Sequence, residues 1–259
     1  MPPRALSPSG LVLVDKPAGP SSFQVIAEIR RRTRARTGHA GTLDPFASGL
    51  LLVLSGAATR LAPWLVGLDK RYVTEVSLEA RTSTGDPEGE VVETLDAPDA
   101  GELERRVAGL RGEIELPIPA ASAVKIDGER AYRRHRRGEV VEMPLRRSRV
   151  DALDVVAYAD GIATLDLRVG SGTYVRAIAD ALGGHCRTLR RTEVGPFSVE
   201  DADPERILPA ADALPFLPAV EVDADTAEAI RAGRTRAEPE TRTIHDGELV
   251  AVGSVVMPV

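Results

Sequence analysis

The stretch "TGHAGTLDPFASGLLLVLS" (residues 37–55) decides how this chain is organised. Its first part is rich in small residues and is punctuated by glycine and proline, which predicts a loop over residues 37–49. Residues 50–54 are continuously apolar, and the segment 50–55 predicts a buried strand. One acid, Asp44, stands before a proline inside the loop. The stretch therefore predicts a carboxylate held at the rim of a sheet.

Strand and helix patterns are mixed on both sides of this stretch. Apolar runs and alternating patterns predict strands within residues 10–19, 50–55, 71–80 and 187–202, and a hairpin over 149–170 that turns at Asp160-Gly161. Helical spacing predicts helices within 20–33, 56–70, 99–112 and 173–186, and strand-loop-helix character over 117–139. This order indicates an α+β fold with a mixed, largely antiparallel sheet flanked by helices and loops.

The bulk composition limits the class of protein. With 259 residues, 43% hydrophobic and 28% charged, the chain is typical of a globular protein. No apolar run approaches the roughly 20 residues that cross a bilayer, and the start does not resemble a signal peptide. The single cysteine, Cys186, excludes an internal disulfide and a multi-cysteine metal site. Glycine-rich phosphate loops and HExxH are also lacking, so we expect a cytoplasmic protein with neither cofactor nor metal.

Charge is segregated along the chain, although the net charge is −6. Five arginines face one acid over residues 28–36, nine Lys or Arg face four acids over 125–149, and five arginines face one acid over 168–191. From residue 193 onward, fourteen acids face five arginines. Because polyanions bind to local patches, the basic segments predict a polyanion-binding surface despite the net charge.

A Pro-rich, acidic stretch over residues 208–221 predicts a domain boundary. We expect a main domain over residues 1–213 and a small β-rich appendix over 214–259. The appendix carries much of the acidic charge, so strong phosphate contacts are expected from the main domain instead.

Three residues have side chains suited to chemistry. Asp44 could attack an electrophilic carbon such as the sugar C1′ of a glycosidic bond, although an Asp-Pro pair also commonly starts a turn. Arg176 could pair with a buried acid and keep it ionised, or lie on the surface. Tyr72 could stack on a nucleobase, or belong to the core. Among the other polar residues, His39 could stack or hydrogen-bond to RNA, and Lys16 and Lys125 could bind phosphate or be solvated.

Several segments together resemble one known family. In chain order they are "LVLVDKPAGPSS", "GHAGTLDPFASGLLLV", "GAATRLAPWLVGLDKRY", "RTSTGDPEGE", "SAVKIDGERAYRRHRRGE", "GSGTYVRAIADALG" and "TLRRTEVGPF". They resemble the TruB family of tRNA pseudouridine synthases, which isomerise uridine 55 in the T-loop. The resemblance covers roughly residues 10 to 200, and the "GHAGTLDPFASG" block is its most specific part.

The resemblance implies a role for each matching residue. Asp44 matches the catalytic aspartate that engages C1′ while the base detaches, rotates and rejoins through C5. Both a nucleophilic addition at C1′ and an elimination through a glycal require it. Arg176 matches its arginine partner, and Tyr72 matches the tyrosine that stacks on the target base. His39 matches the histidine that helps to open the T-loop, and Leu189 matches a residue that contacts the uracil. The remaining matches imply positions that line or support the RNA cleft: Lys16, Asp86, Lys125 and Tyr174.

The resemblance also implies partners and alternatives. The expected partner is the T-arm of tRNA with a flipped-out uridine, bound by a monomer without metal, cofactor or membrane. Two departures stand out: Ser83 stands where many relatives carry an acid, and the C-terminal part is short for a PUA domain, so an incomplete PUA-like version is expected. The alternatives are a pseudouridine synthase for another RNA site and an RNA-binding or tRNA-folding protein with secondary catalysis.

Overall fold

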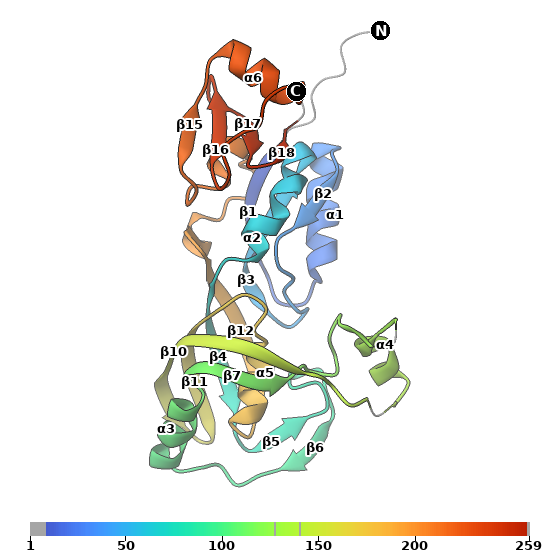
Figure 1. Cartoon of the computed structure of the whole chain (residues 1–259). Coiled ribbons are helices and arrows are strands. Elements are labelled where there is room, and N and C mark those ends of the chain that lie inside the picture. Colours follow the sequence, from blue (N-terminus) through green and yellow to red (C-terminus); the bar gives the residue numbers. More distant parts are fainter. Residues whose placement is uncertain (1–8, 127, 140, 258–259) are drawn as a thin grey trace. The chain divides into compact units, whose positions relative to one another are not determined.

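The structure is a computed structural model that describes residues 9–126, 128–139 and 141–257. The N-terminal residues, on which the expectation about a signal peptide rests, lie outside these ranges. The chain forms two compact units (Figure 1): the first consists of Met1–Leu68 and Glu193–Val259, and the second of Asp69–Thr192. Within the described ranges, no helix is both long and apolar enough to cross a membrane.

The first unit is built on the strand that the sequence predicts after the glycine-rich loop. β3 (Ser48–Ser55) pairs antiparallel with β1 (Gly10–Lys16), and β14 (Leu208–Pro209) pairs with the other side of β1. β2 (Thr37–His39) pairs antiparallel with β3, so the predicted loop begins with a short strand. The strands expected within residues 10–19 and 50–55 are confirmed.

Both faces of β3 are covered, which explains its continuous apolar run. One face contributes Leu51 and Val53 to a cluster with residues of β1 and of the helix α1 (Ser22–Thr33). The other face contributes to a larger cluster with η1 (Gly56–Leu61) and α2 (Ala62–Val66). The helix expected over 56–70 is therefore present as a 3₁₀ turn followed by one short α-helix.

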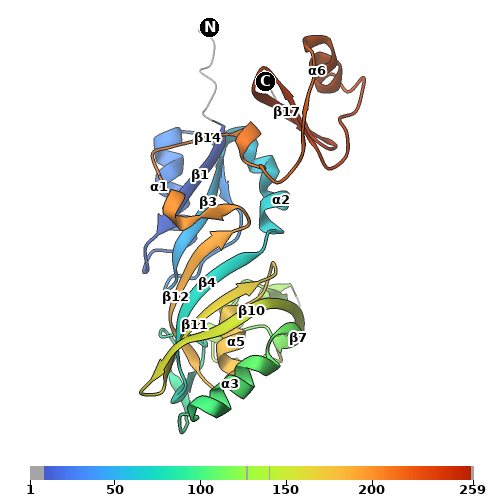
Figure 2. The same ribbon diagram turned by 90° about the vertical axis from the view of Figure 1, so that its left-hand side faces the viewer.

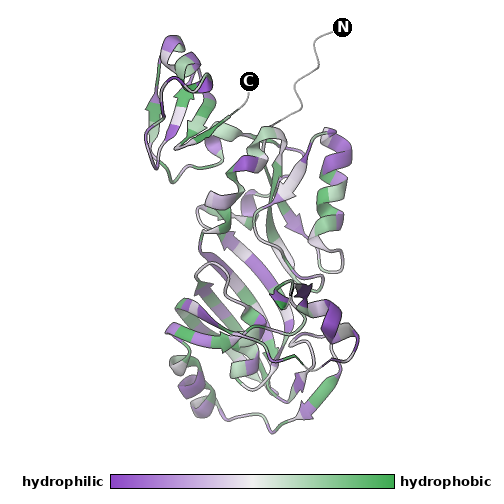
Figure 3. Cartoon of the chain, turned by 45° about the vertical axis from the view of Figure 1, so that its right-hand side comes forward, coloured by the Kyte–Doolittle hydropathy of each residue, from purple (hydrophilic) through white to green (hydrophobic). Residues whose placement is uncertain are grey.

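Helix α1 begins with a capping box. The Ser21 side chain accepts a hydrogen bond from the Gln24 amide, and the Gln24 side chain accepts one from the Ser21 amide at 2.7 Å. Ile26 and Ile29 face the core, whereas the last turn carries exposed arginines. Figure 3 shows these hydrophobic and hydrophilic stretches of α1. The helix thus has one buried side and one basic side.

The C-terminal part of the first unit forms a separate small sheet. Its strands are β15 (Ala219–Glu221), β16 (Arg242–His245), β17 (Glu248–Val252) and β18 (Val255–Val256), in that order. A helix that the sequence analysis did not predict, α6 (Ala224–Arg231), packs on β17. The expected β-rich appendix is confirmed, while the boundary at residue 213 stays a prediction.

The second unit contains an antiparallel sheet (Figure 2). β4 (Lys70–Ser77) lies between β12 (His185–Val194) and β11 (Ile162–Val169), followed by β10 (Leu145–Ala159) and β7 (Gly112–Pro117). Strands β10 and β11 form the predicted hairpin. Its turn residues Asp160 and Gly161 both have positive φ (50° and 69°), as a two-residue hairpin turn of this kind requires.

The described part of the second unit also contains three helices and two small hairpins. α3 (Ala100–Gly109) packs on β10, and α5 (Val175–Ala181) packs near β7. β5 (Ala80–Thr82) pairs with β6 (Val91–Thr94), and β8 (Lys125–Ile126) pairs with β9 (Glu129–Arg130) ahead of α4 (Ala131–Arg136). The predicted class, α+β with largely antiparallel sheets, is confirmed.

Candidate active site

Asp44 lies in the loop between β2 and β3, and the backbone on each side of it is hydrogen-bonded to other parts of the first unit. On the N-terminal side, the Leu43 amide donates to Oγ of Ser22 at 3.0 Å, and the same hydroxyl donates to the Leu43 carbonyl at 2.9 Å. On the C-terminal side, the Pro45 carbonyl accepts from the Gly19 amide at 2.8 Å. Asp44 is partly buried. Its position is therefore fixed through its two neighbours in the chain.

Lys16 supports the same loop through its ammonium group. Its Nζ donates to the carbonyl oxygens of Pro17, Pro20 and Pro45 at 2.9, 2.8 and 3.2 Å. The side chain is 0% exposed. A buried ammonium requires such partners, because its desolvation would otherwise be very costly. The structure thus places Lys16 as a support of the Asp44 loop, and contact between Lys16 and RNA stays a prediction.

The serine that holds Leu43 gives the first testable expectation. We expect Ser22→Ala to lower the free energy of unfolding by about 1–3 kcal/mol, because it leaves a buried amide and a buried carbonyl without their partner. The neighbouring Ser21→Ala should cost about 1 kcal/mol through loss of the helix cap alone. Urea denaturation of both variants measures the difference. An unchanged midpoint for Ser22→Ala would show that this hydroxyl does not stabilise the loop.

The basic segment before the loop lies on α1 and the residues that follow it. Its exposed arginines are Arg30, Arg31, Arg32, Arg34 and Arg36. Arg32 forms an ion pair with Glu205, which comes from the acidic C-terminal part of the sequence. The acidic part therefore neutralises one member of the cluster, while the cluster as a whole remains positively charged.

His39 ends β2, five residues before Asp44. Its imidazole contacts the ring of Phe23 on α1 edge to face, with centroids 5.7 Å apart and planes at 73°. The His39 side chain is partly buried, whereas Phe23 is largely exposed. The structure thus joins the predicted RNA-contacting histidine to an aromatic residue that the sequence analysis did not select.

In the second unit, Arg176 and Asp86 form a buried ion pair. Nη1 of Arg176 lies 3.4 Å from Oδ2 of Asp86, and only 3% and 7% of the two side chains are exposed. Arg176 also donates to the carbonyls of Thr84 at 2.6 Å and Ala121 at 3.0 Å. Asp86 accepts from the Thr84 hydroxyl at 2.6 Å and the Glu88 amide at 3.1 Å. These bonds fix the guanidinium at the start of α5.

The structure therefore gives Arg176 a partner that the sequence analysis did not assign to it. Asp86 was expected only to line or support the RNA cleft. Asp44 belongs to the first unit and Arg176 to the second, and the expected pairing of these two residues stays a prediction.

Tyr72 and Leu189 lie on the neighbouring strands β4 and β12 of the second unit. Two hydrogen bonds link the strands close to them: the Thr74 hydroxyl donates to the Thr188 carbonyl at 2.6 Å, and the Thr188 hydroxyl accepts from the Glu75 amide at 3.1 Å. Tyr72 is 8% exposed and Leu189 is 7% exposed. The structure thus places the predicted base-stacking and uracil-contacting residues on adjacent strands.

Lys70 shares a face of β4 with Tyr72, because side chains two residues apart in a strand point the same way. Burial and, to a smaller extent, the nearby charge of Arg191 lower the pKa of Lys70 to about 8, although Asp69 acts in the opposite direction. Nζ of Lys70 donates to Oγ of Ser171 at 3.4 Å. At neutral pH most of this ammonium is still protonated, so the face that carries Tyr72 also carries a cation.

Tyr174 and Lys125 are placed in different surroundings. Tyr174 directly precedes α5, and its ring centroid lies 5.8 Å from Cζ of Arg146, which is a cation–π arrangement. Lys125 is exposed on β8. Neither residue is tied to the Arg176–Asp86 pair by a direct contact that the structure establishes, and their roles toward RNA stay predictions.

The basic segment around α4 is partly neutralised by its own acids. Arg137 donates to Glu129 and Glu139, and Arg134 donates to Glu139. These hydrogen bonds hold the pKa of both glutamates below its ordinary value. Lys125 remains as an exposed cation of this segment. Fewer of its cations are therefore unpaired than the nine Lys and Arg of the segment suggest.

Sequence reasoning missed Ser22, which bonds to Leu43, and Phe23, which contacts His39. The two consecutive serines were a signal, because only one of them can cap the helix. The hydroxyl of the other is then available for a hydrogen bond elsewhere. The structure makes Ser21 the cap and gives Ser22 to Leu43. Phe23 shared the apolar spacing of α1, so nothing local distinguished it from a core residue.

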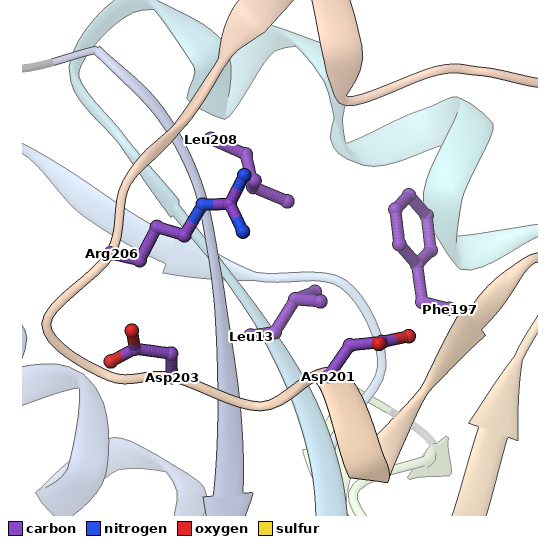
Figure 4. Close-up of a pocket in the computed structure, with 6 residues that line it drawn as sticks. All are labelled: Leu13, Phe197, Asp201, Asp203, Arg206 and Leu208. Atoms are coloured by element: carbon purple, nitrogen blue, oxygen red, sulfur yellow. The ribbon is translucent and has the colours of Figure 1, made fainter.

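The first unit contains a pocket of about 210 Å³ whose walls are mostly apolar (Figure 4). Leu13, Phe197 and Leu208 give it apolar walls. Asp201 and Asp203 outnumber Arg206 among its charged residues, so its charge disfavours phosphate. Among the described residues, no cluster of three or more His, Cys, Asp or Glu could hold a metal ion.

Comparison with known proteins identifies the family of this arrangement. Residues 30–175 match the model of the TruB family pseudouridylate synthase (N terminal domain). A protein of Corynebacterium efficiens named tRNA pseudouridine synthase B is 46% identical over 209 residues, which are 76% of this chain and 70% of the relative. A protein of the same name from Leifsonia xyli subsp. xyli is 42% identical over 239 residues, which are 86% of this chain and 78% of the relative.

Solved structures agree with the fold. The match in the structure of an H/ACA RNP bound to a substrate RNA containing 2′-deoxyuridine has a TM-score of 0.70 at 23% identity, over 96% of this chain and 78% of that one. The match in the archaeal box H/ACA sRNP Nop10-Cbf5 complex has a TM-score of 0.68 at 22% identity, over 100% of this chain and 87% of that one. The family model and the relatives that are 42–46% identical place this chain in the TruB family of pseudouridylate synthases.

Proposed function

We propose that this protein isomerises uridine to pseudouridine at position 55 in the T-loop of tRNA. The observation that carries the proposal is the Asp44 loop, which is held on both sides by hydrogen bonds in a chain of the TruB family. The name tRNA pseudouridine synthase B, borne by relatives that are 42–46% identical, supports tRNA as the substrate. We further expect the protein to act in the cytoplasm as a monomer.

The reaction requires one base to leave and rejoin the same sugar. The bond between C1′ and N1 breaks, the uracil rotates, and a bond forms between C1′ and C5. The C5 proton then passes to water, and N1 takes up a proton, so that the product is an isomer of the substrate. The Asp44 carboxylate serves this sequence by adding to C1′ or by assisting an elimination to a glycal. In either route the carboxylate must be held in place, and the hydrogen bonds of Leu43 and Pro45 hold the loop that carries it.

The second unit supplies the other groups. In the proposal, the guanidinium of Arg176, fixed by Asp86, keeps the Asp44 carboxylate ionised, since a nearby cation favours the charged form of an acid. Tyr72 stacks on the uracil, and Leu189 contacts it. The flipped base leaves the RNA stack at a cost of a few kcal/mol, which contacts to the RNA backbone offset.

The exposed arginines on and after α1, together with Lys125, are suited to bind the phosphates of the T-arm. Cations that contact phosphates release counterions, so this part of the binding depends on salt. Arg32, already paired with Glu205, contributes less than its neighbours in this proposal.

We expect the purified protein to release tritium from T-arm RNA labelled at C5 of uridine, without added nucleotide or metal. Release is expected because C5 exchanges its proton for the bond to C1′. A T-arm whose only labelled uridine lies outside position 55 is the matched control and should release none. Absence of release from the position-55 substrate at high enzyme concentration would contradict the proposed function.

A further inference from the structure

The first unit holds a pocket of about 340 Å³ between α1 and the strand β2. Phe23, Ile26 and Arg30 line it from the helix, and Thr37 and His39 line it from the strand. Pockets of this size accommodate small organic groups. Because its lining combines two rings, a hydroxyl and a guanidinium, the pocket can offer both stacking and polar contacts.

Phe23 is the most notable of these residues. It is 68% exposed, more than any other large hydrophobic side chain among the described residues. Ile26 and Ile29, on the same helix, are only 7% and 3% exposed. A single exposed aromatic is common on protein surfaces. This one, however, also contacts a histidine ring and lines a pocket, so that its open face is available beside polar groups.

The hydroxyl of Thr37 adds a second, independent observation. Its Oγ1 is buried, and it has no hydrogen-bond partner among the described residues. A buried hydroxyl without a partner costs free energy, and this cost is recovered if the Thr37 side chain turns toward the pocket that it lines and bonds to the polar edge of a ligand. Arg30 is exposed at the same pocket and can pair with an anionic group such as a phosphate.

We propose that this pocket binds a second unpaired nucleobase of the substrate RNA, next to the target uridine, with Phe23 as its stacking platform. An aromatic face, a hydrogen-bonding group for the base edge and a cation for the phosphate are together the groups that bind unstacked nucleotides. The inference rests on the proposed function. Since His39, at the end of β2, precedes Asp44 by only five residues, the second base lies close to the target in the RNA.

The inference is tested by measuring the affinity of T-arm RNA for Phe23→Ala, Phe23→Leu and Phe23→Trp. We expect Phe23→Ala to weaken binding roughly 10- to 100-fold, as loss of one base–aromatic stack does. Phe23→Leu keeps an apolar side chain without an aromatic face, and should lose most of the affinity that Phe23→Ala loses. Phe23→Trp should bind as well as the unchanged protein. If Leu binds as well as Phe, the contact is not a stack and the inference is wrong.

Abasic nucleotides identify the stacked base. Each nucleotide flanking the target uridine is replaced in turn by an abasic one, and binding of the unchanged protein and of Phe23→Ala is compared. One such RNA should bind both proteins equally, because the stack is already absent. If Phe23→Ala weakens the binding of every abasic RNA as much as it weakens the binding of the intact RNA, the inference is wrong. Phe216→Ala, an exposed phenylalanine elsewhere in the first unit, is the matched control and should bind normally.

Failure of this inference and failure of the proposed function give different results. If the unchanged protein releases tritium from the position-55 substrate but Phe23→Ala binds and reacts like it, only the second base site is wrong. If the unchanged protein releases none, the proposed function is wrong.

Discussion

Asp44→Asn is expected to abolish turnover while T-arm RNA still binds within several-fold of the unchanged protein. Asparagine has nearly the same shape, but its amide can neither add to C1′ nor carry the negative charge. Loss of a reacting group of this kind lowers kcat by roughly 10⁴-fold or more. Tritium release measures turnover, and filter binding of the same RNA measures affinity.

The bonds around Asp44 explain why binding should survive. The hydrogen bonds of Leu43 and Pro45 involve the backbone of these two residues and persist in the variant, so they should keep the loop in its conformation. If binding falls by the same factor as turnover, Asp44 is a structural residue. A tRNA-folding activity, the alternative from another class of function, would persist in Asp44→Asn and is distinguished in this way.

Arg176→Met is expected to lower the free energy of unfolding by about 3–5 kcal/mol and to eliminate tritium release. The substitution leaves the Asp86 carboxylate buried, with 7% exposure, and without its cation. The carbonyls of Thr84 and Ala121 lose their donor as well. Chemical denaturation measures the first effect, and tritium release measures the second.

The double variant Arg176→Met with Asp86→Leu separates stability from chemistry. Replacing both members of a buried pair by apolar residues is often close to neutral, so much of the lost stability should return. Tritium release should remain absent, because the guanidinium proposed to act on Asp44 is still missing. Recovery of both stability and turnover would show that Arg176 is needed only for folding.

Most of the fold could be predicted from the sequence, because its signals are local. The apolar run of β3 and the Asp160-Gly161 turn each lie within a few residues, and both were predicted. β2 was missed because three residues are too short to show a period. Helix α6 was missed although Asp223 caps it through the Thr226 amide, since the surrounding strand signals dominated that segment.

The candidate site was predictable in its residues but not in its contacts. Asp44, Arg176 and Asp86 were all selected from motifs. The Arg176–Asp86 pair joins residues 90 positions apart in the chain, and no local pattern shows which of many acids a buried arginine will meet. The burial of Lys16 could not be predicted either, because nothing in the local sequence distinguishes a lysine that donates to carbonyls from one that contacts solvent.

Helix α1 has a consequence for how substrate and catalyst influence each other. Ser22 and Phe23 are neighbours, yet Ser22 faces inward and holds Leu43, whereas Phe23 faces outward into the proposed base site. A nucleobase that stacks on Phe23 would restrain the same first turn that restrains the Asp44 loop. By thermodynamic reciprocity, an ordered loop would then raise the affinity for that base by the same factor. The helix would thus couple binding of the RNA to ordering of the loop that carries the Asp44 carboxylate.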